Sequence, residues 1–287
     1  MEAVELIKKV RRIEIKTRGL TRHIFAGEYH SAFKGRGIAF SEVREYQYGD
    51  DIRSIDWNVT ARFNHPWVKV YEEERELTVM LLIDVSGSGD FGSRTGFKRD
   101  LMTEIAAVLS FSAIYNNDKI GVIFFTDKVE KFIPPQKGRK HILRIIRELL
   151  DCTPQSRRTD LREPLRFLTN AIRKRCTAFV ISDFLASDFE EALRIASSKH
   201  DIVALRVSDP LEKALPDVGL MKVVDSETGE EKWIDTTSKN LRKAYSDWHN
   251  RHSESLTNTM KKCAVDFTEI STGEDYVKPL IKLFKSR

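Results

Sequence analysis

Residues 77–88 read Leu-Thr-Val-Met-Leu-Leu-Ile-Asp-Val-Ser-Gly-Ser, an apolar run that gives way to Asp84, Ser86 and Ser88. Such a run is typical of a parallel strand buried on both faces. Alternate residues of an extended chain point to the same side, so the three polar side chains can converge just beyond the strand. One carboxylate and two hydroxyls are ligands that suit a small, hard cation. The stretch therefore predicts a metal site at the end of a buried strand.

The sequence on either side supports this placement. Apolar residues at helical spacing predict a helix over 97–115. A strand, a polar turn and a helix in that order place the triplet at the carboxyl end of a strand, where open α/β sheets bind ligands. Thr159 opens another helical pattern and Asp183 follows the apolar run 178–181, so both are expected at the same edge.

The fold class follows from the alternation of strand and helix patterns after residue 76. We predict an α/β domain over 77–287 with a doubly wound, mostly parallel sheet. The predicted strands are 77–83, 120–125, 129–133 (an edge strand), 178–181, 202–207 and 265–270, and the predicted helices are 97–115, 141–150, 161–175, 189–198, 238–263 and 276–284. A hairpin is expected at 223–234. Residues 1–76 are predicted to form a smaller α+β part, with an N-terminal amphipathic helix and strands at 38–46 and 67–73.

Five polar residues resemble, in type and order, the metal-ion-dependent adhesion site of von Willebrand factor A domains: Asp84, Ser86, Ser88, Thr159 and Asp183. The resemblance implies that they coordinate Mg²⁺ (or Mn²⁺), directly or through water. It also implies that one coordination position is left for an Asp or Glu side chain of a protein partner. Related sequences usually carry small residues before the threonine, whereas this chain has Arg157 and Arg158.

An upstream signature resembles that of the bacterial family catalogued as domain of unknown function 58. It consists of Gly35-Arg36-Gly37, Phe40, Arg44-Glu45-Tyr46, Gly49-Asp50-Asp51, Arg53, Ile55-Asp56-Trp57 and Ala61-Arg62. This second resemblance implies a von Willebrand factor A-like domain that works beside a MoxR-type AAA+ ATPase.

Arginines and carboxylates are interleaved in this upstream segment. We favour a structural clamp, in which ion pairs fix the small part on the large one, over a second acidic site. The clamp residues are Arg44, Asp50, Arg53, Asp56 and Arg62. Trp57 and Trp67 are expected in the core of the small part.

Composition argues against several other functions. Lys+Arg 48 against Asp+Glu 43 gives a net charge of +5, but the two signs are interleaved, which argues against nucleic-acid binding. Three cysteines without a CxxC indicate neither a disulfide framework nor a zinc site. His249 and His252 are expected to face solvent.

No apolar run approaches the roughly 20 residues that cross a bilayer. The beginning of the chain lacks a signal-peptide core, so we expect a cytoplasmic protein without membrane insertion.

Catalysis has no evident agent in the sequence. No GxSxG elbow surrounds Ser86, no GxxxxGK[ST] loop exists, and Ser86 stands where an aspartyl phosphatase would carry its second carboxylate. We therefore predict a metal-dependent protein-interaction module and not an enzyme. A metal-dependent hydrolase using the same cluster is the alternative, and a nucleic-acid-binding protein is a third reading.

Overall fold

The computed structural model describes residues 39–72, 77–93 and 96–287. These residues belong to two compact units, a small one that ends at residue 77 and a large α/β unit that begins at Thr78. The helix predicted near the N-terminus lies outside the described residues. No helix in the described part of the chain combines the length and the apolar character that crossing a membrane requires.

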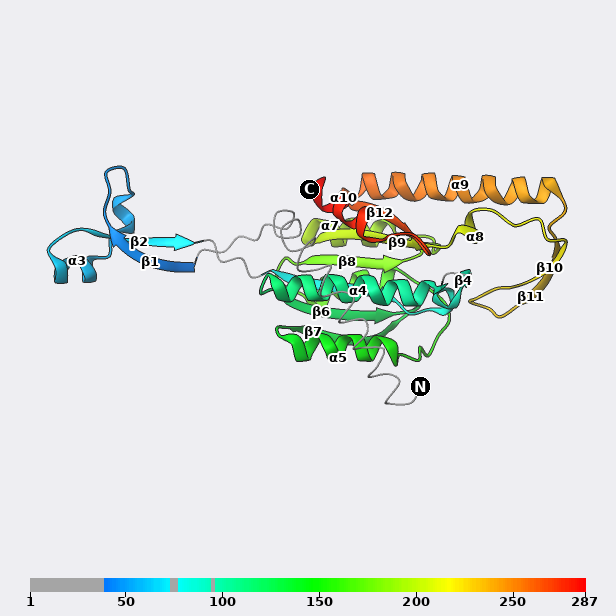
Figure 1. Ribbon diagram of the computed structural model, residues 1–287, viewed down its shortest axis with the longest axis horizontal. Coiled ribbons are helices and arrows are strands. Elements are labelled where there is room, and N and C mark those ends of the chain that lie inside the picture. Colours follow the sequence, from blue (N-terminus) through cyan, green and yellow to red (C-terminus); the bar gives the residue numbers. More distant parts are fainter. Residues whose placement is uncertain (1–38, 73–76, 94–95) are drawn as a thin grey trace. The chain divides into compact units, whose positions relative to one another are not determined.

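A six-stranded sheet forms the centre of the large unit, with the strand order β12-β9-β8-β3-β6-β7 (Figure 1). Its strands are β3 (Thr78–Asp84), β6 (Lys119–Phe125), β7 (Val129–Gln136), β8 (Thr177–Ser182), β9 (Asp201–Ser208) and β12 (Asp266–Ser271). Neighbours are parallel except β6 and β7, which confirms the predicted mostly parallel sheet. The chain order reverses between β3 and β8, and this is the position where doubly wound folds bind ligands.

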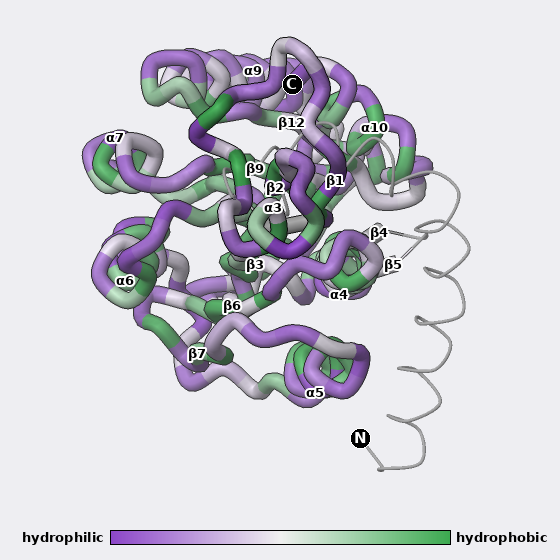
Figure 2. The backbone as a smooth tube through the Cα atoms, turned by 90° about the vertical axis from the view of Figure 1, so that its left-hand side faces the viewer, coloured by the Kyte–Doolittle hydropathy of each residue, from purple (hydrophilic) through white to green (hydrophobic). Residues whose placement is uncertain are grey.

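Helices cover both faces of the sheet (Figure 2). One face carries α4 (Lys98–Tyr115), α5 (Arg139–Leu150) and α10 (Val277–Lys285), and the other carries α6 (Arg162–Ala171), α7 (Glu190–Lys199) and α9 (Lys239–Lys262). A short helix, α8 (Pro210–Lys213), follows β9, and the predicted hairpin is formed by β10 (Leu220–Val224) and β11 (Glu231–Asp235). Two further short strands, β4 (Gly92–Ser93) and β5 (Gly96–Phe97), precede α4.

Burial on both faces explains why the strands are continuously apolar. Met80 and Leu82 of β3 lie in the cluster that also contains residues of α6, α7 and α9. Phe179 of β8 is fully buried and packs edge-on against Phe284 of α10 on the other face, with ring centroids 6.5 Å apart. Figure 2 shows the hydrophobic residues gathered along the central strands.

A buried polar pair lies where β8 and β9 begin. The Cys176 Sγ atom is 3.3 Å from the His200 Nδ1 atom, and both side chains are buried. Burial, with the nearby charges of Lys199 and Arg175, lowers the pKa of His200 to about 4. Burial, with the charge of Asp201, raises the pKa of Cys176 to about 12. Both groups are therefore neutral at pH 7.

The low pKa of His200 predicts a loss of stability in acid. The unfolded imidazole takes up a proton below about pH 6.5, whereas the folded one does so only near pH 4. In this window the unfolded state binds more protons, so the free energy of unfolding falls as the pH is lowered. Urea unfolding at pH 7 and pH 5 should show a smaller loss for His200→Gln than for the wild type. Equal losses in the two proteins would assign the effect to other groups.

The small unit is built on an antiparallel pair, β1 (Ala39–Glu45) and β2 (Trp67–Glu72). Between them lie a 3₁₀ turn, η2 (Ile52–Ser54), and a helix that the sequence patterns do not predict, α3 (Trp57–Phe63). Asp56 caps this helix by accepting hydrogen bonds from the N–H groups of Asn58 and Val59, at 3.0 and 3.3 Å. Trp57 is 67% exposed, so its predicted place in a core is wrong.

The five predicted clamp residues do not act as one group. Arg44 and Asp50 form a bidentate pair, with N···O distances of 2.7 and 2.8 Å, and this pair lowers the pKa of Asp50. Asp56 pairs with Lys69 at 3.3 Å, where the sequence predicts an arginine. Arg53 and Arg62 are exposed, and neither makes an ion pair with any residue that the structure describes. Each observed pair lies inside the small unit and is partly exposed, a setting in which ion pairs contribute little to stability.

Candidate metal centre

Asp84 and Asp183 meet at the reversal point of the sheet. The register pairs Ile83 of β3 with Ile181 of β8, so the polar ends of the two strands lie side by side. Ser182 Oγ donates a hydrogen bond of 2.7 Å to Asp84 Oδ2, which fixes one oxygen of that carboxylate. Asp84 and Asp183 are 4% and 3% exposed. Two buried carboxylates therefore face the same edge.

The loop after β3 folds back on Asp84. The backbone N–H of Ser86 donates to Asp84 Oδ1 at 3.0 Å, and the hydroxyl oxygens of Ser86 and Ser88 are 3.1 Å apart. Both serines are buried, and the chain continues into a short 3₁₀ turn, η3 (Gly87–Asp90). The predicted convergence of Asp84, Ser86 and Ser88 is therefore present in the structure.

Thr159 lies in a loop that is tied to the same place. Before Thr159 in the chain, the carbonyl of Arg157 accepts a hydrogen bond of 3.1 Å from the N–H of Gly87. After it, the N–H of Asp160 donates a hydrogen bond of 3.1 Å to the carbonyl of Thr126, which directly follows β6. The Thr159 Oγ1 atom is buried and has no hydrogen-bond partner among the described residues. Arg157 uses its backbone in this contact and its side chain is exposed, so the loop accommodates the bulk of that residue.

Lys98, the first residue of α4, holds Asp183. Its Nζ atom is 3.0 Å from Asp183 Oδ2 and 2.6 Å from Glu212 Oε1, and its side chain is 1% exposed. Leu185 N–H donates to Asp183 Oδ1 at 3.2 Å. Burial by itself raises the pKa of Asp183, but the charge and hydrogen bond of Lys98, with the bonds from Ser88 and Leu185, outweigh it and lower the pKa. Asp183 therefore favours the ionised form.

Asp84 is in the opposite electrostatic situation. Burial in the first place, and the charge of Asp183 in the second, raise the pKa of Asp84 to about 6, against the hydrogen bonds from Ser182 and Ser86. A cation between the two carboxylates would offset both effects, because it would replace lost hydration and screen their repulsion.

The donor set fits a hard cation. It offers two carboxylates and the hydroxyls of two serines and a threonine, and Mg²⁺ prefers such oxygen ligands. No cluster of three or more His, Cys, Asp or Glu side chains suited to a metal occurs within the described ranges. The fit therefore depends on the hydroxyls, and above all on the unpartnered Thr159 Oγ1.

Sequence patterns miss three residues of this site: Ser182, Lys98 and Glu212. Ser182 is adjacent to Asp183, and only the pairing of β8 with β3 shows that it bonds to Asp84. Lys98 carries a weak signal, because a cation at the first residue of a helix opposes the helix dipole. Glu212 lies on the four-residue helix α8, where no periodicity can identify it.

The turn of the β10–β11 hairpin lies against the loop after β3, where Ser226 approaches Gly87. A Cβ atom on Gly87 would lie only 2.3 Å from the carbonyl oxygen of Ser226, so glycine is required at this close approach. Three large apolar side chains near the site are exposed, Phe91 at 39%, Leu185 at 43% and Leu211 at 43%. The site thus has a polar centre with exposed apolar residues close by in the chain.

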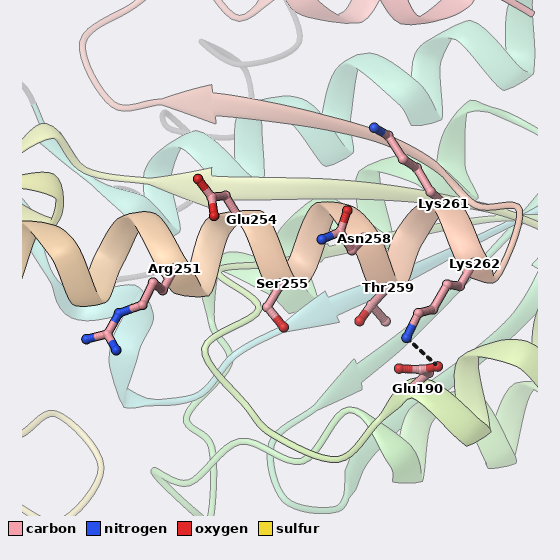
Figure 3. Close-up of a pocket in the computed structure, with 8 residues that line it drawn as sticks. All are labelled: Glu190, Arg251, Glu254, Ser255, Asn258, Thr259, Lys261 and Lys262. Atoms are coloured by element: carbon pink, nitrogen blue, oxygen red, sulfur yellow. Dashed lines mark ion pairs between the residues drawn. The ribbon is translucent and has the colours of Figure 1, made fainter.

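An open groove of about 600 Å³ lies between α9 and the start of α7 (Figure 3). It is lined by Glu190, Arg251, Glu254, Ser255, Asn258, Thr259, Lys261 and Lys262. The ion pair between Lys262 and Glu190, 3.7 Å long, bridges it. None of the predicted site residues lies there.

The two histidines of α9 do not both face solvent, contrary to the expectation. His249 is 6% exposed and lies 3.5 Å from a guanidinium nitrogen of the buried Arg206. His252 is half-buried, stacks on Trp248 and contacts the carbonyl of Phe184 through Nε2 at 3.0 Å. Both serve to pack α9 on the sheet.

Sequence comparisons identify a family and relatives of this chain. The model of a family described as "Protein of unknown function DUF58" matches residues 42–255. The uncharacterized protein Rv1480 of Mycobacterium tuberculosis is 30% identical over 288 residues, which cover 99% of this chain and 90% of that protein.

Among solved structures, an aerotolerance-related membrane protein from Bacteroides fragilis superposes with a TM-score of 0.51 at 15% identity, over 73% of this chain and 97% of that one. The SpRpn10 VWA domain gives a TM-score of 0.40 at 12% identity, over 74% of this chain and 95% of that one. At these identities the likeness concerns the fold alone.

Proposed function

The chain belongs to the DUF58 family, and from this premise and its von Willebrand factor A-like fold we propose that it is a metal-dependent protein-interaction module. The metal is Mg²⁺ or Mn²⁺, and the partner contributes an Asp or Glu side chain to it. The residues that would hold the metal, directly or through water, are Asp84, Ser86, Ser88, Thr159 and Asp183.

The unpartnered hydroxyl of Thr159 carries this proposal. A buried hydroxyl without a hydrogen bond costs roughly 1–3 kcal/mol, so an orphan is retained where it has a ligand. Its loop is anchored to the loop after Asp84, whose carboxylate is buried. When bound, Mg²⁺ supplies the positive charge that attracts an external carboxylate, since its octahedral shell is often completed by groups from outside the protein.

The neighbouring residues favour a protein partner. Phe91 directly follows η3, Leu185 lies two residues after Asp183, and Leu211 directly precedes Glu212. All three are exposed. Aromatic and large apolar side chains are typical of the centre of a protein interface. The partner segment that fits such a site offers a carboxylate with apolar residues beside it.

A metal titration tests the proposal. Calorimetry should show one Mg²⁺ or Mn²⁺ site in the wild type. We expect Asp84→Asn to weaken it at least about tenfold, because the variant keeps the shape but loses the charge, and Thr159→Val to weaken it less. Asp247→Asn, an exposed position on α9, is the matched control and should titrate like the wild type. Indistinguishable titrations of wild type and Asp84→Asn, with both proteins folded, would refute the metal site.

The alternatives give different results with the same proteins. A hydrolase would turn over phosphate or ester substrates in Mg²⁺ and lose that turnover in Asp84→Asn. A nucleic-acid binder would retain its affinity in Asp84→Asn, because phosphate contacts come from surface cations. The family resemblance supports a MoxR-type AAA+ ATPase as the partner to assay first, with and without EDTA.

A further inference from the structure

Lys98 is a buried cation inside the candidate metal centre. Its ammonium group contacts Asp183 at 3.0 Å and Glu212 at 2.6 Å, and lies 5.8 Å from the centre of the Phe91 ring. These three partners come from the end of β8, from α8 and from the loop after η3. Lysine is almost never fully buried unless it is paired. The carboxylates must therefore hold it there, against the dipole of α4.

The charges around Lys98 do not balance. Asp84, Asp183 and Glu212 carry three negative charges when ionised, and Lys98 supplies one positive charge, so a net charge of −2 remains. A divalent cation would balance the remainder. The same cation would have to share Asp183 with an ammonium group already bound to it, and like charges a few ångströms apart in a buried site repel strongly.

We propose that Lys98 is a tethered counter-ion that sets the metal affinity of this site. It stabilises the carboxylates when no metal is bound, and it competes with the metal for Asp183. Glu212 gives the ammonium group a second partner, which it retains when the metal takes Asp183. The inference rests on the proposed function, because it concerns the same metal. It adds that the site is built to stay folded without metal and to bind metal reversibly.

Lys98→Met tests this by removing the charge and keeping most of the volume of the side chain. We expect calorimetry to show Mg²⁺ binding that is at least about tenfold tighter than in the wild type, because the competing charge is gone. We also expect Mg²⁺, compared with EDTA, to raise the melting temperature of the variant by more than that of the wild type, because tighter binding stabilises the folded state more. Lys140→Met is the matched control: it removes an exposed cation of α5, and it should leave both readouts unchanged.

A second variant covers the case in which Lys98→Met does not fold without metal. Lys98→Met/Glu212→Gln removes one carboxylate together with the lysine, so the net charge stays at −2, and it should also bind Mg²⁺ more tightly than the wild type. Equal affinities in the wild type and both variants would overturn the role of Lys98 and leave the proposed metal site intact. Binding in the variants but not in the wild type would support the role of Lys98 and refute a metal-dependent function. No binding in any of the three proteins would refute both.

Discussion

Asp183→Ala should lower the free energy of unfolding of the metal-free protein by about 3 kcal/mol. Removing one partner of a buried ion pair costs roughly 3–5 kcal/mol, because the other charge is left without compensation. Here Lys98 is 1% exposed, and Glu212, its remaining partner, is 19% exposed, so we expect the lower end of that range. Urea unfolding in EDTA measures the effect.

The control for this experiment is Asp90→Ala. Asp90 also pairs with a cation, Arg99, at 3.3 Å, but its side chain is 67% exposed. Exposed ion pairs contribute about 0–1 kcal/mol, so this variant should unfold nearly like the wild type. A loss below about 1 kcal/mol for Asp183→Ala would mean that Lys98 finds water or another partner when Asp183 is removed, and that the pair does not stabilise the fold.

Phe179→Ala should be at least as damaging, at about 3–5 kcal/mol. The ring is completely buried in β8 and packs edge-on against Phe284 of α10. Its removal loses the transfer free energy of the ring and leaves a cavity that a central strand cannot close by moving. Denaturant unfolding, monitored by far-UV circular dichroism, gives the number.

Tyr115→Ala, at the last residue of α4, is the comparison for the loss of an aromatic ring. Tyr115 is 58% exposed, and surface substitutions usually change stability by no more than about 0.5 kcal/mol. Similar losses for the two variants would show that the face under α10 is loosely packed and that the continuous apolar pattern of β8 does not report a tight core.

The central sheet could be predicted because its strands are buried on both faces. Burial of that kind demands continuous apolar runs such as 79–83 and 178–181, and few other elements produce them. The polar residues that end these runs mark the carboxyl edge, so Asp84 and Asp183 could be placed there before the structure was known. Their shared edge follows from the parallel pairing of β3 and β8.

Lys98 shows what such patterns cannot supply. Its partners, Asp183 and Glu212, are 85 and 114 residues away in the chain, and only the assembled fold brings them to its ammonium group. In the sequence it is one lysine among 48 Lys and Arg residues.

The structure of the small unit could not be predicted from sequence patterns for a different reason. Helix α3 has seven residues, too few for an apolar face to show its period, and it depends on the cap from Asp56. A unit of this size buries little, since Val68 is its one buried hydrophobic residue among those described. Expecting an aromatic residue such as Trp57 in its core assumed a larger core than the described residues of this unit form.

The central position of β3 has a consequence for synthesis on the ribosome, where a chain emerges from its N-terminus onward. β3 is the first strand of the large sheet to emerge, and β6 and β7 then extend the sheet on one side. β8, β9 and β12 extend it on the other side. Each new strand therefore pairs with a strand that has already been synthesised. Lys98 is synthesised soon after Asp84. Asp183 follows Asp84 by about 100 residues, and Glu212 is synthesised later still. The cation is therefore present before the anions that will enclose it, and the last charges to be buried enter beside a charge of opposite sign.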